Sequence, residues 1–254
     1  MIRYKTEDEI RKIRHASRIV FETLLRVEEL VQPGVTLQEL DTAAEDYILS
    51  QGAIPGFKGL YDFPATLCLS PNDMVVHGIP DKTVLNEGDI IGVDCGAIVD
   101  GYYGDHAKSF AVGKISEENQ KLLDITKESL HRGIAQCVPG NHLNDIGHAI
   151  QSFSESHGYS VVRELVGHGI GQKLHEDPQV PNYGIAGTGV ELKAGMCLAI
   201  EPMINAGVKE IYTGDDGWAV MTRDGKYSAH FEHTIAITAN GPVVLSTIEK
   251  TVFD

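Results

Sequence analysis

Two aspartates, Asp94 and Asp105, stand 11 residues apart on either side of a predicted β-hairpin. The segment 89–99 is largely apolar, and Asp100-Gly101 is a strong signal for a two-residue turn. A turn centred there places Asp94 opposite Ala107, and side chains 105 and 107 project from the same face of their strand. The two carboxylates are therefore predicted to be diagonal neighbours on one face of the hairpin.

Two carboxylates this close, flanked by apolar residues such as Phe110, would repel each other strongly in surroundings of low dielectric constant. Either one of them holds a proton or a cation lies between them, and we favour the cation. Glu201 and Glu232 present the same situation, because each is predicted to lie in an apolar strand, 197–201 and 231–237. Any one such acid, taken alone, is most often a solvated surface carboxylate. Four at matching positions predict a cage of formal charge about −4, which suits two divalent cations.

A histidine in a glycine-rich segment could complete this cage. In Gly167-His168-Gly169-Ile170-Gly171 the imidazole is flanked by residues that let backbone approach a ligand closely. One imidazole with four carboxylates is a mixed nitrogen and oxygen set. By ligand softness such a set suits Mn, Fe, Co or Zn and does not discriminate among them.

The elements that must position these residues occur twice. A predicted helix that begins with a capping box at Thr6 ends at Pro33-Gly34, and a second helix follows it. A further pair of helices is predicted before and after Pro139-Gly140. The two Pro-Gly pairs are 106 residues apart, and the apolar positions of the following helices shift by the same offset. The pattern indicates an internal repeat.

The predicted strands repeat as well. Residues 85–94 align with 192–201 at an offset of 107, which matches Asp94 with Glu201. Further on, Asp105-His106-Ala107 resembles Glu232-His233-Thr234. The gap between the paired acids is 11 residues in the first half and 31 in the second, so the second half carries 20 extra residues there.

Each half is thus predicted to be two helices followed by several antiparallel strands. Together they predict an α+β fold with the sheet inside and the helices outside. We expect a single catalytic domain over residues 1–254, with internal halves of about 1–113 and 114–254.

Composition narrows the class of protein. Hydrophobic residues make up 42% and charged residues 22%, as in ordinary globular proteins. No apolar run approaches the roughly 18 residues of a membrane span, and the charged N-terminal segment does not resemble a secretory signal. The formal charge of −15 argues against a broad nucleic-acid surface. The four cysteines (Cys68, Cys95, Cys137 and Cys197) form no CxxC pair and fit reduced, buried thiols. We expect a cytoplasmic protein with neither a membrane nor a specific nucleic acid as partner.

Six short segments resemble the type I methionine aminopeptidases of peptidase family M24 in order, spacing and context. They are His77-Gly-Ile-Pro, the Asp94 and Asp105 pair, Gly167-His168-Gly-Ile-Gly, His175-Glu-Asp-Pro, Ile200-Glu201-Pro-Met and Phe231-Glu232-His-Thr. The resemblance covers nearly the whole chain. It implies the duplicated fold called pita-bread and two divalent metal ions, with these five ligands: Asp94, Asp105, His168, Glu201 and Glu232. It also implies that Asp105 and Glu232 bridge both ions.

The resemblance further implies removal of the N-terminal methionine from nascent polypeptides, with a preference for a small second residue. Two metals can turn a bridging water into hydroxide near neutral pH and polarise the scissile carbonyl. Glu201 is then the candidate proton shuttle to the leaving amine. His175 would stabilise the oxyanion or contact the substrate carbonyl, and His77 would contact the backbone of the second residue.

An apolar pocket of fixed depth is expected for the methionine side chain. The resemblance places it around Tyr61–Cys68 together with Trp218, and Phe63, Cys68 and Trp218 are the expected lining residues. Plain core packing is the alternative for these three residues, because aromatic residues and cysteines are commonly buried.

Two histidines depart from the family pattern. His106 stands where Ser or Thr is usual, and His230 stands where Gln is common. Each could orient the carboxylates from outside the metal cage or serve as an extra, inhibitory ligand. The sequence leaves these two readings open, along with the identity of the metal (Co, Mn, Fe or Zn).

Two other functions compete with this one. A proline-specific peptidase of the same fold, an Xaa-Pro aminopeptidase or dipeptidase, would usually carry an additional N-terminal domain. A metal-free binding protein on this scaffold would usually have lost ligands, and all five are present. We expect a monomer that acts on nascent polypeptide N-termini and contacts the ribosome transiently.

Overall fold

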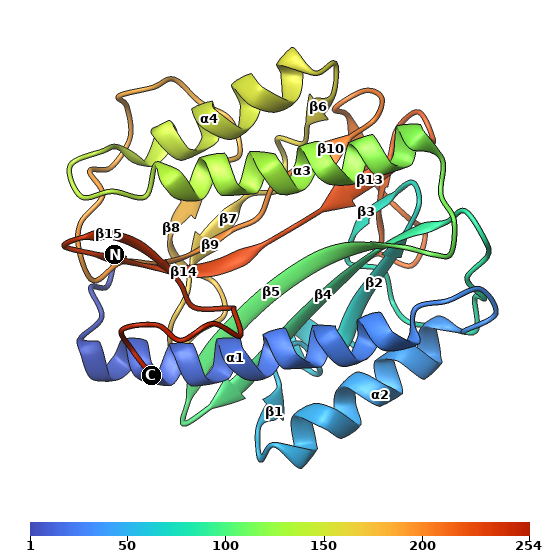
Figure 1. Cartoon of the computed structure of the whole chain (residues 1–254), viewed down its shortest axis with the longest axis horizontal. Helices are drawn as coiled ribbons and strands as arrows, with labels where there is room; N and C mark the ends of the chain where they lie inside the picture. Colours follow the sequence, from blue (N-terminus) through green and yellow to red (C-terminus); the bar gives the residue numbers. More distant parts are fainter.

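Four long helices and antiparallel strands make up the chain, and the computed structural model describes all 254 residues (Figure 1). The helices are α1 (Glu7–Leu30), α2 (Leu37–Ser50), α3 (Glu117–Ala135) and α4 (Leu143–Ser156), with a short 3-10 helix, η1, at Leu60–Asp62. The strands are β1 (Ile54–Pro55), β2 (Leu67–Pro71), β3 (Met74–Val76), β4 (Ile90–Val99), β5 (Tyr102–Ala111), β6 (Ser160–Val161), β7 (Gly167–Gly169), β8 (Glu176–Val180), β9 (Cys197–Ile200), β10 (Met203–Asn205), β11 (Ile211–Thr213), β12 (Val220–Thr222), β13 (Ser228–His230), β14 (His233–Thr238) and β15 (Gly241–Val244). In Figure 1 the strands lie between the α1–α2 pair and the α3–α4 pair, which confirms a sheet inside and helices outside.

The helices confirm the repeat. The predicted capping box at the start of α1 forms, because Glu9 N donates to Thr6 Oγ1 at 3.3 Å and Thr6 N donates to Glu9 Oε2 at 2.8 Å. Helices α2 and α4 are both 14 residues long, and their first residues, Leu37 and Leu143, are 106 positions apart. The two halves therefore use the same helical pair at the predicted offset.

The β4–β5 hairpin has the predicted register. Both turn residues adopt left-handed backbone, with φ of 49° at Asp100 and 77° at Gly101, as a two-residue hairpin turn requires. Asp94 pairs with Ala107, and Asp105 pairs with Gly96. The two aspartates are thus diagonal neighbours on one face, as the turn position and the two-residue period of a strand predicted.

The second half builds a five-stranded sheet in the order β15-β14-β9-β7-β8. The expectation that Glu201 and Glu232 lie within strands was wrong, because β9 ends at Ile200 and β14 begins at His233. Pro202 has no N–H to continue the ladder. The chain also changes sheets here, since β10 pairs with β13 and β6 in a separate sheet. Both glutamates therefore lie just beyond the ends of paired strands.

Hydrogen bonds join the halves where β5 meets the start of β14. Glu232 N donates to the Ala107 carbonyl at 2.9 Å, and the Thr234 hydroxyl donates to the Asp105 carbonyl at 2.7 Å. Two apolar clusters belong almost wholly to one half each, and a third combines Phe63 of the first half with residues of the second, such as Leu174. The metal-ligand candidates lie along this junction.

Candidate metal centre and active site

Three strands and two segments at strand ends bring the candidate ligands together. Asp94 and Asp105 come from β4 and β5, and His168 comes from β7. One ligand atom each from Asp105, His168 and Glu232 lie within 4.8 Å of one another, and all three residues are buried. His168 Nε2 is 3.6 Å from Asp105 Oδ2 and 3.4 Å from Glu201 Oε1. The predicted ligands from the two halves therefore meet at one place.

Glycines explain how His168 reaches this position. A Cβ atom on Gly167 would lie 2.4 Å from the Ala199 carbonyl oxygen, and one on Gly169 would lie 2.2 Å from the Asp177 carbonyl oxygen. Only glycine allows β7 to pack this closely between its neighbours. The His168 Nδ1 atom is 3.0 Å from the Gly169 carbonyl, which leaves Nε2 directed at the carboxylates.

The electrostatics of the site favour a cation. Burial raises the pKa of Asp94 from 3.8 to about 7. The pKa values of Asp105, Glu201 and Glu232 are raised well above their usual range, first by burial and then by the charges of neighbouring acids. Burial also lowers the pKa of His168 to about 4, so its imidazole is neutral and able to bind a metal.

The donor atoms fit a divalent metal. Asp94 Oδ1, Asp105 Oδ1 and Glu232 Oε1 are buried and have no hydrogen-bond partner. Such atoms are costly unless something compensates them. The 3.4 and 3.6 Å separations around His168 exceed a hydrogen bond. They match two ligands on one ion, since bonds of about 2.0–2.2 Å at a tetrahedral angle separate their donor atoms by about 3.4 Å.

One cavity contains all five candidate ligands and the residues expected to bind substrate. The cavity has an empty volume of about 530 Å³, which includes the open space at its entrance. The expected residues that line it are His77, His175, Phe63, Cys68 and Trp218. Phe63 and Trp218 meet edge to face with ring centroids 5.0 Å apart. The apolar wall therefore adjoins the ligand cluster.

Four further residues, which were not predicted individually, line the cavity: Phe57, Leu60, Tyr61 and Leu174. A signal for Phe57 was present, because a glycine inside an apolar strand often marks a close approach. A Cβ on Gly96 of β4 would lie 2.6 Å from the Phe57 ring. Leu174 directly precedes His175 in the sequence, and its proximity to a candidate site residue was the only signal.

The two non-ligand histidines lie beside the ligand cluster. His175 meets the His168 ring edge to face with centroids 4.5 Å apart, and it stacks on Tyr61 at 6.1 Å. His77 adopts left-handed backbone with φ of 64°, a conformation found more often at functional sites than elsewhere. Burial lowers the pKa of both imidazoles.

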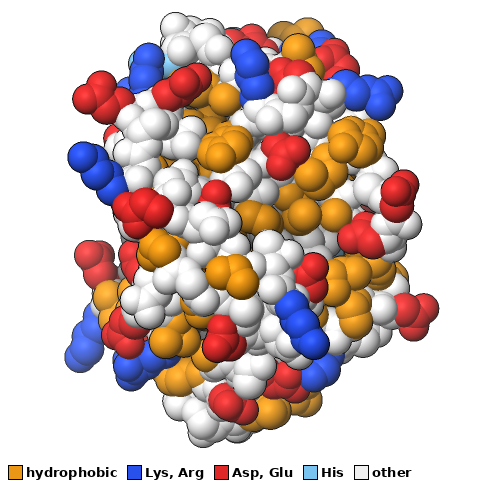
Figure 2. Space-filling model, turned by 90° about the vertical axis from the view of Figure 1, so that its right-hand side faces the viewer, with side chains coloured by type: hydrophobic (Ala, Val, Ile, Leu, Met, Phe, Trp, Pro, Cys, Tyr) orange, Lys and Arg blue, Asp and Glu red, His pale blue; other side chains and the backbone are white.

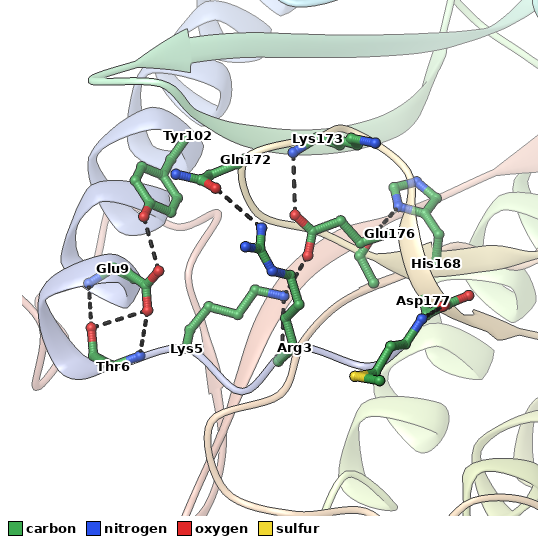
Figure 3. A network of polar contacts seen from close by, with 12 residues as sticks. Arg3, Lys5, Thr6, Glu9, Tyr102, His168, Gln172, Lys173, Glu176 and Asp177 are labelled. Carbon is green, nitrogen blue, oxygen red and sulfur yellow. Dashed lines mark hydrogen bonds and ion pairs between the residues drawn. The ribbon is translucent and has the colours of Figure 1, made fainter.

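A buried ion pair supports the loop of His175. Lys5 Nζ lies 2.9 Å from Glu176 Oε2, and their side chains are only 4% and 6% exposed (Figure 3). Glu176 follows His175 directly, and it also accepts a hydrogen bond from Lys173 N. The first residues of the chain are thereby held against this loop.

The surface on view in Figure 2 has basic side chains standing among acidic and apolar ones, with no continuous basic area on that face. None of the four α-helices combines the length and the apolar character that a membrane span requires.

Comparisons with known proteins agree with this site. The model of metallopeptidase family M24 matches residues 11–239. A methionine aminopeptidase of Clostridium perfringens is 52% identical over 249 residues, which cover 98% of this chain and 100% of the relative. The chain belongs to metallopeptidase family M24, among the type I methionine aminopeptidases. This membership confirms the family that the six sequence segments predicted.

Solved structures of the family confirm the fold. The methionine aminopeptidase of Rickettsia prowazekii has a TM-score of 0.96 and 42% identity, covering 97% of this chain and 100% of that one. A prolidase from Pyrococcus furiosus has a TM-score of 0.80 at 24% identity, and the match covers 66% of that longer chain. The second comparison bears on the fold alone. Both match the pita-bread architecture that the family resemblance implied, with which the duplicated halves agree.

The two departures from the methionine aminopeptidase pattern have different surroundings. His106 lies between Phe21 and His233, with ring centroids 5.5 and 4.5 Å away, and its Nδ1 contacts the Glu232 carbonyl. His230 Nε2 lies 3.9 Å from Glu201 Oε2 and is buried without a hydrogen-bond partner. His106 thus stacks on two rings and contacts a carbonyl through Nδ1, whereas the Nε2 of His230 has no partner.

Proposed function

We propose that this chain hydrolyses the first peptide bond of polypeptides that begin with methionine, releasing that residue, and that it prefers a small second residue. One observation carries the proposal: five metal-ligand candidates and an apolar wall with Phe63 and Trp218 line the same cavity. Hydrolysis and recognition of an apolar side chain can therefore take place side by side. The similar proteins are named methionine aminopeptidases, which supports methionine as the residue whose side chain is recognised.

The proposed centre holds two divalent ions of the first transition series, Co, Mn, Fe or Zn. The residues that would hold the ions are Asp94, Asp105, His168, Glu201 and Glu232. The ions would polarise the scissile carbonyl and lower the pKa of water at the site. Support comes from the orphaned carboxylate oxygens and the neutral His168 imidazole.

Three residues of the chain act on the substrate in this proposal. Glu201 carries a proton from the attacking water to the leaving amine, which its position in the cavity supports. His175 donates a hydrogen bond to the oxyanion, and its ring lies against that of His168. His77 binds the backbone of the second residue from the cavity wall. The two histidines orient the peptide bond while Glu201 moves the proton.

The methionine side chain would enter the part of the cavity formed by Phe63, Cys68 and Trp218. Cys68 pairs with Asp94 across β2 and β4. The floor of the pocket is therefore directly beside a metal-ligand candidate, and a side chain of fixed length held there brings its own carbonyl to the centre. This coupling of side-chain length to reaction is the proposed basis of selectivity for methionine.

The proposal includes the physiological setting that the family resemblance implies. The substrates are the N-termini of nascent polypeptides, and the chain works as a monomer in the cytoplasm with transient contact with the ribosome.

Hydrolysis of Met-Gly-Ser and of an Xaa-Pro dipeptide, measured side by side, tests the function. Chelated protein is reconstituted with Co²⁺, Mn²⁺, Zn²⁺ or, without oxygen, Fe²⁺, and the chelated protein itself is the control. We expect methionine to be released from Met-Gly-Ser in a metal-dependent way. Preferential cleavage of the Xaa-Pro dipeptide, or no hydrolysis with any of these metals, would contradict the proposal.

A further inference from the structure

Glu201 lies between two histidines. Its Oε1 atom is 3.4 Å from His168 Nε2, while its Oε2 atom is 3.9 Å from His230 Nε2. The first pair belongs to the proposed two-ion centre, whereas the second pair faces a different imidazole. One carboxylate thus presents its two oxygens to two nitrogen donors.

His230 is held in this position by its backbone. Its N–H donates to the Ser109 hydroxyl at 2.9 Å, and that hydroxyl donates to the His230 carbonyl at 2.9 Å. The residue also pairs with Met203 in the β10–β13 ladder. His230 is only 4% exposed, and its Nε2 has no hydrogen-bond partner. A buried, unpaired nitrogen held beside a carboxylate oxygen calls for a ligand between them.

The spacing of these two atoms suits a metal ion better than a hydrogen bond. A separation of 3.9 Å is too long for an N–H···O bond. Two metal–ligand bonds of about 2.0–2.1 Å at a tetrahedral angle place their donor atoms about 3.4 Å apart, so a side-chain shift of about 0.5 Å brings both atoms onto one ion. Imidazole with carboxylate is a donor pair that binds Co²⁺ or Zn²⁺.

We propose that His230 Nε2 and Glu201 Oε2 form an accessory cation position for a transition metal, beside the proposed two-ion centre. This inference rests on the proposed function, because it assigns Glu201 to both places. With two protein donors the position is weaker than the main centre and fills last. An ion there occupies the Glu201 oxygen needed for proton transfer and so inhibits hydrolysis.

Titration of the chelated protein with Co²⁺ alone, by calorimetry at neutral pH, tests the inference. The wild type should show a weaker binding step after the main ones, and H230Q should bind Co²⁺ much less tightly in that step. We expect the affinity of the last step to fall at least about tenfold, because loss of an outer-shell partner alone changes metal affinity by about 10- to 100-fold. The matched control is H106T, which replaces the other unusual histidine and should keep the weaker step.

Proton NMR of the Co²⁺-loaded protein gives a second readout. An imidazole bound through Nε2 retains an exchangeable Nδ1–H, whose signal a nearby Co²⁺ shifts strongly. The wild type and H106T should gain one such signal during the weaker step, and H230Q should not. Excess Co²⁺ should correspondingly slow Met-Gly-Ser hydrolysis by the wild type and by H106T but not by H230Q.

The outcomes separate the two proposals. If the wild type hydrolyses Met-Gly-Ser but shows neither the weaker step nor the extra signal, the accessory position is refuted and the proposed function stands. A weaker step of equal affinity in H230Q refutes it too. If the wild type binds no Co²⁺, the accessory position is refuted, whereas the proposed function fails only if Mn²⁺, Zn²⁺ and Fe²⁺ also give no hydrolysis. Circular dichroism verifies the fold of H230Q, and the wild-type titration decides the matter even if that variant misfolds.

Discussion

Removing metal from this chain should make its stability fall as the pH rises. In the absence of a cation, burial holds a proton on Asp94, whose pKa is about 7 in the folded chain against a usual 3.8. The unfolded chain loses that proton near pH 4, so between these values the folded state binds more protons than the unfolded state. The stabilising contribution is then complete below about pH 4 and is lost as the pH rises toward 7.

The size of the effect follows from the two pKa values of Asp94. Raising the pH from about 5 to about 7 costs the metal-free folded state roughly 2 kcal/mol at this residue. In a chain of this length the loss lowers the Tm by roughly 5 °C. Asp105, Glu201 and Glu232 shift in the same direction and add to the loss. A bound cation favours the ionised carboxylates, so the loaded protein should not show this fall.

Thermal unfolding of chelated and metal-loaded protein at the two pH values checks this reasoning. The gap between their Tm values should widen as the pH rises. Chelated D94N, whose amide does not titrate, should lose about 2 kcal/mol less than the chelated wild type between the two pH values. The control is D124N, on the exposed face of α3, which should behave like the wild type. An equal loss in D94N and the wild type would refute the assignment to Asp94.

Other predictions concern activity and folding. Replacing Glu201 with Gln should lower kcat by about 10²- to 10⁴-fold with an unchanged circular dichroism spectrum, and wild-type turnover would exclude it as the proton shuttle. His175→Ala should lower kcat by about 10²- to 10³-fold with little change in KM, whereas a pure rise in KM would contradict an oxyanion role. Trp218→Ala should lower kcat/KM for methionyl peptides by about tenfold through lost apolar contact, measured by steady-state kinetics. We also propose that residues 1–254 form one domain, so calorimetry should record a single unfolding transition. Two separate transitions would contradict a single domain.

Local rules were sufficient to predict the hairpin and the helices. The Asp100-Gly101 turn and the two-residue period of strands fix the register of Asp94 against Ala107, which the structure has. The capping boxes mark the starts of α1 and α2. They too are local features, because each depends on two residues three positions apart. Such features need no knowledge of how distant parts of the chain pack.

Features that depend on the docking of distant segments were not predictable in this way. The break at Glu201 arises because β9 and β10 join different sheets, and the sequence signals only Pro202. Lys5 and Glu176 are 171 residues apart, and nothing in their local sequences indicates that they pair. The same holds for the unpaired Nε2 of His230, whose importance depends on Glu201 lying beside it.

The duplication explains why neither half could hold the proposed centre alone. His106 and His233 are repeat equivalents, and their rings stack 4.5 Å apart with planes only 7° from parallel. The pseudo-two-fold axis therefore passes between them. The axis relates Asp105 to Glu232 and Ala107 to Thr234. Accordingly, Asp105 is hydrogen-bonded to Thr234 on one side of the axis, and Ala107 to Glu232 on the other. Asp105 and Glu232, the two acids proposed to bridge the ions, thus come from different halves, and one half supplies too few of the proposed donors for two ions. Metal binding at the proposed site would therefore stabilise the docking of the two halves.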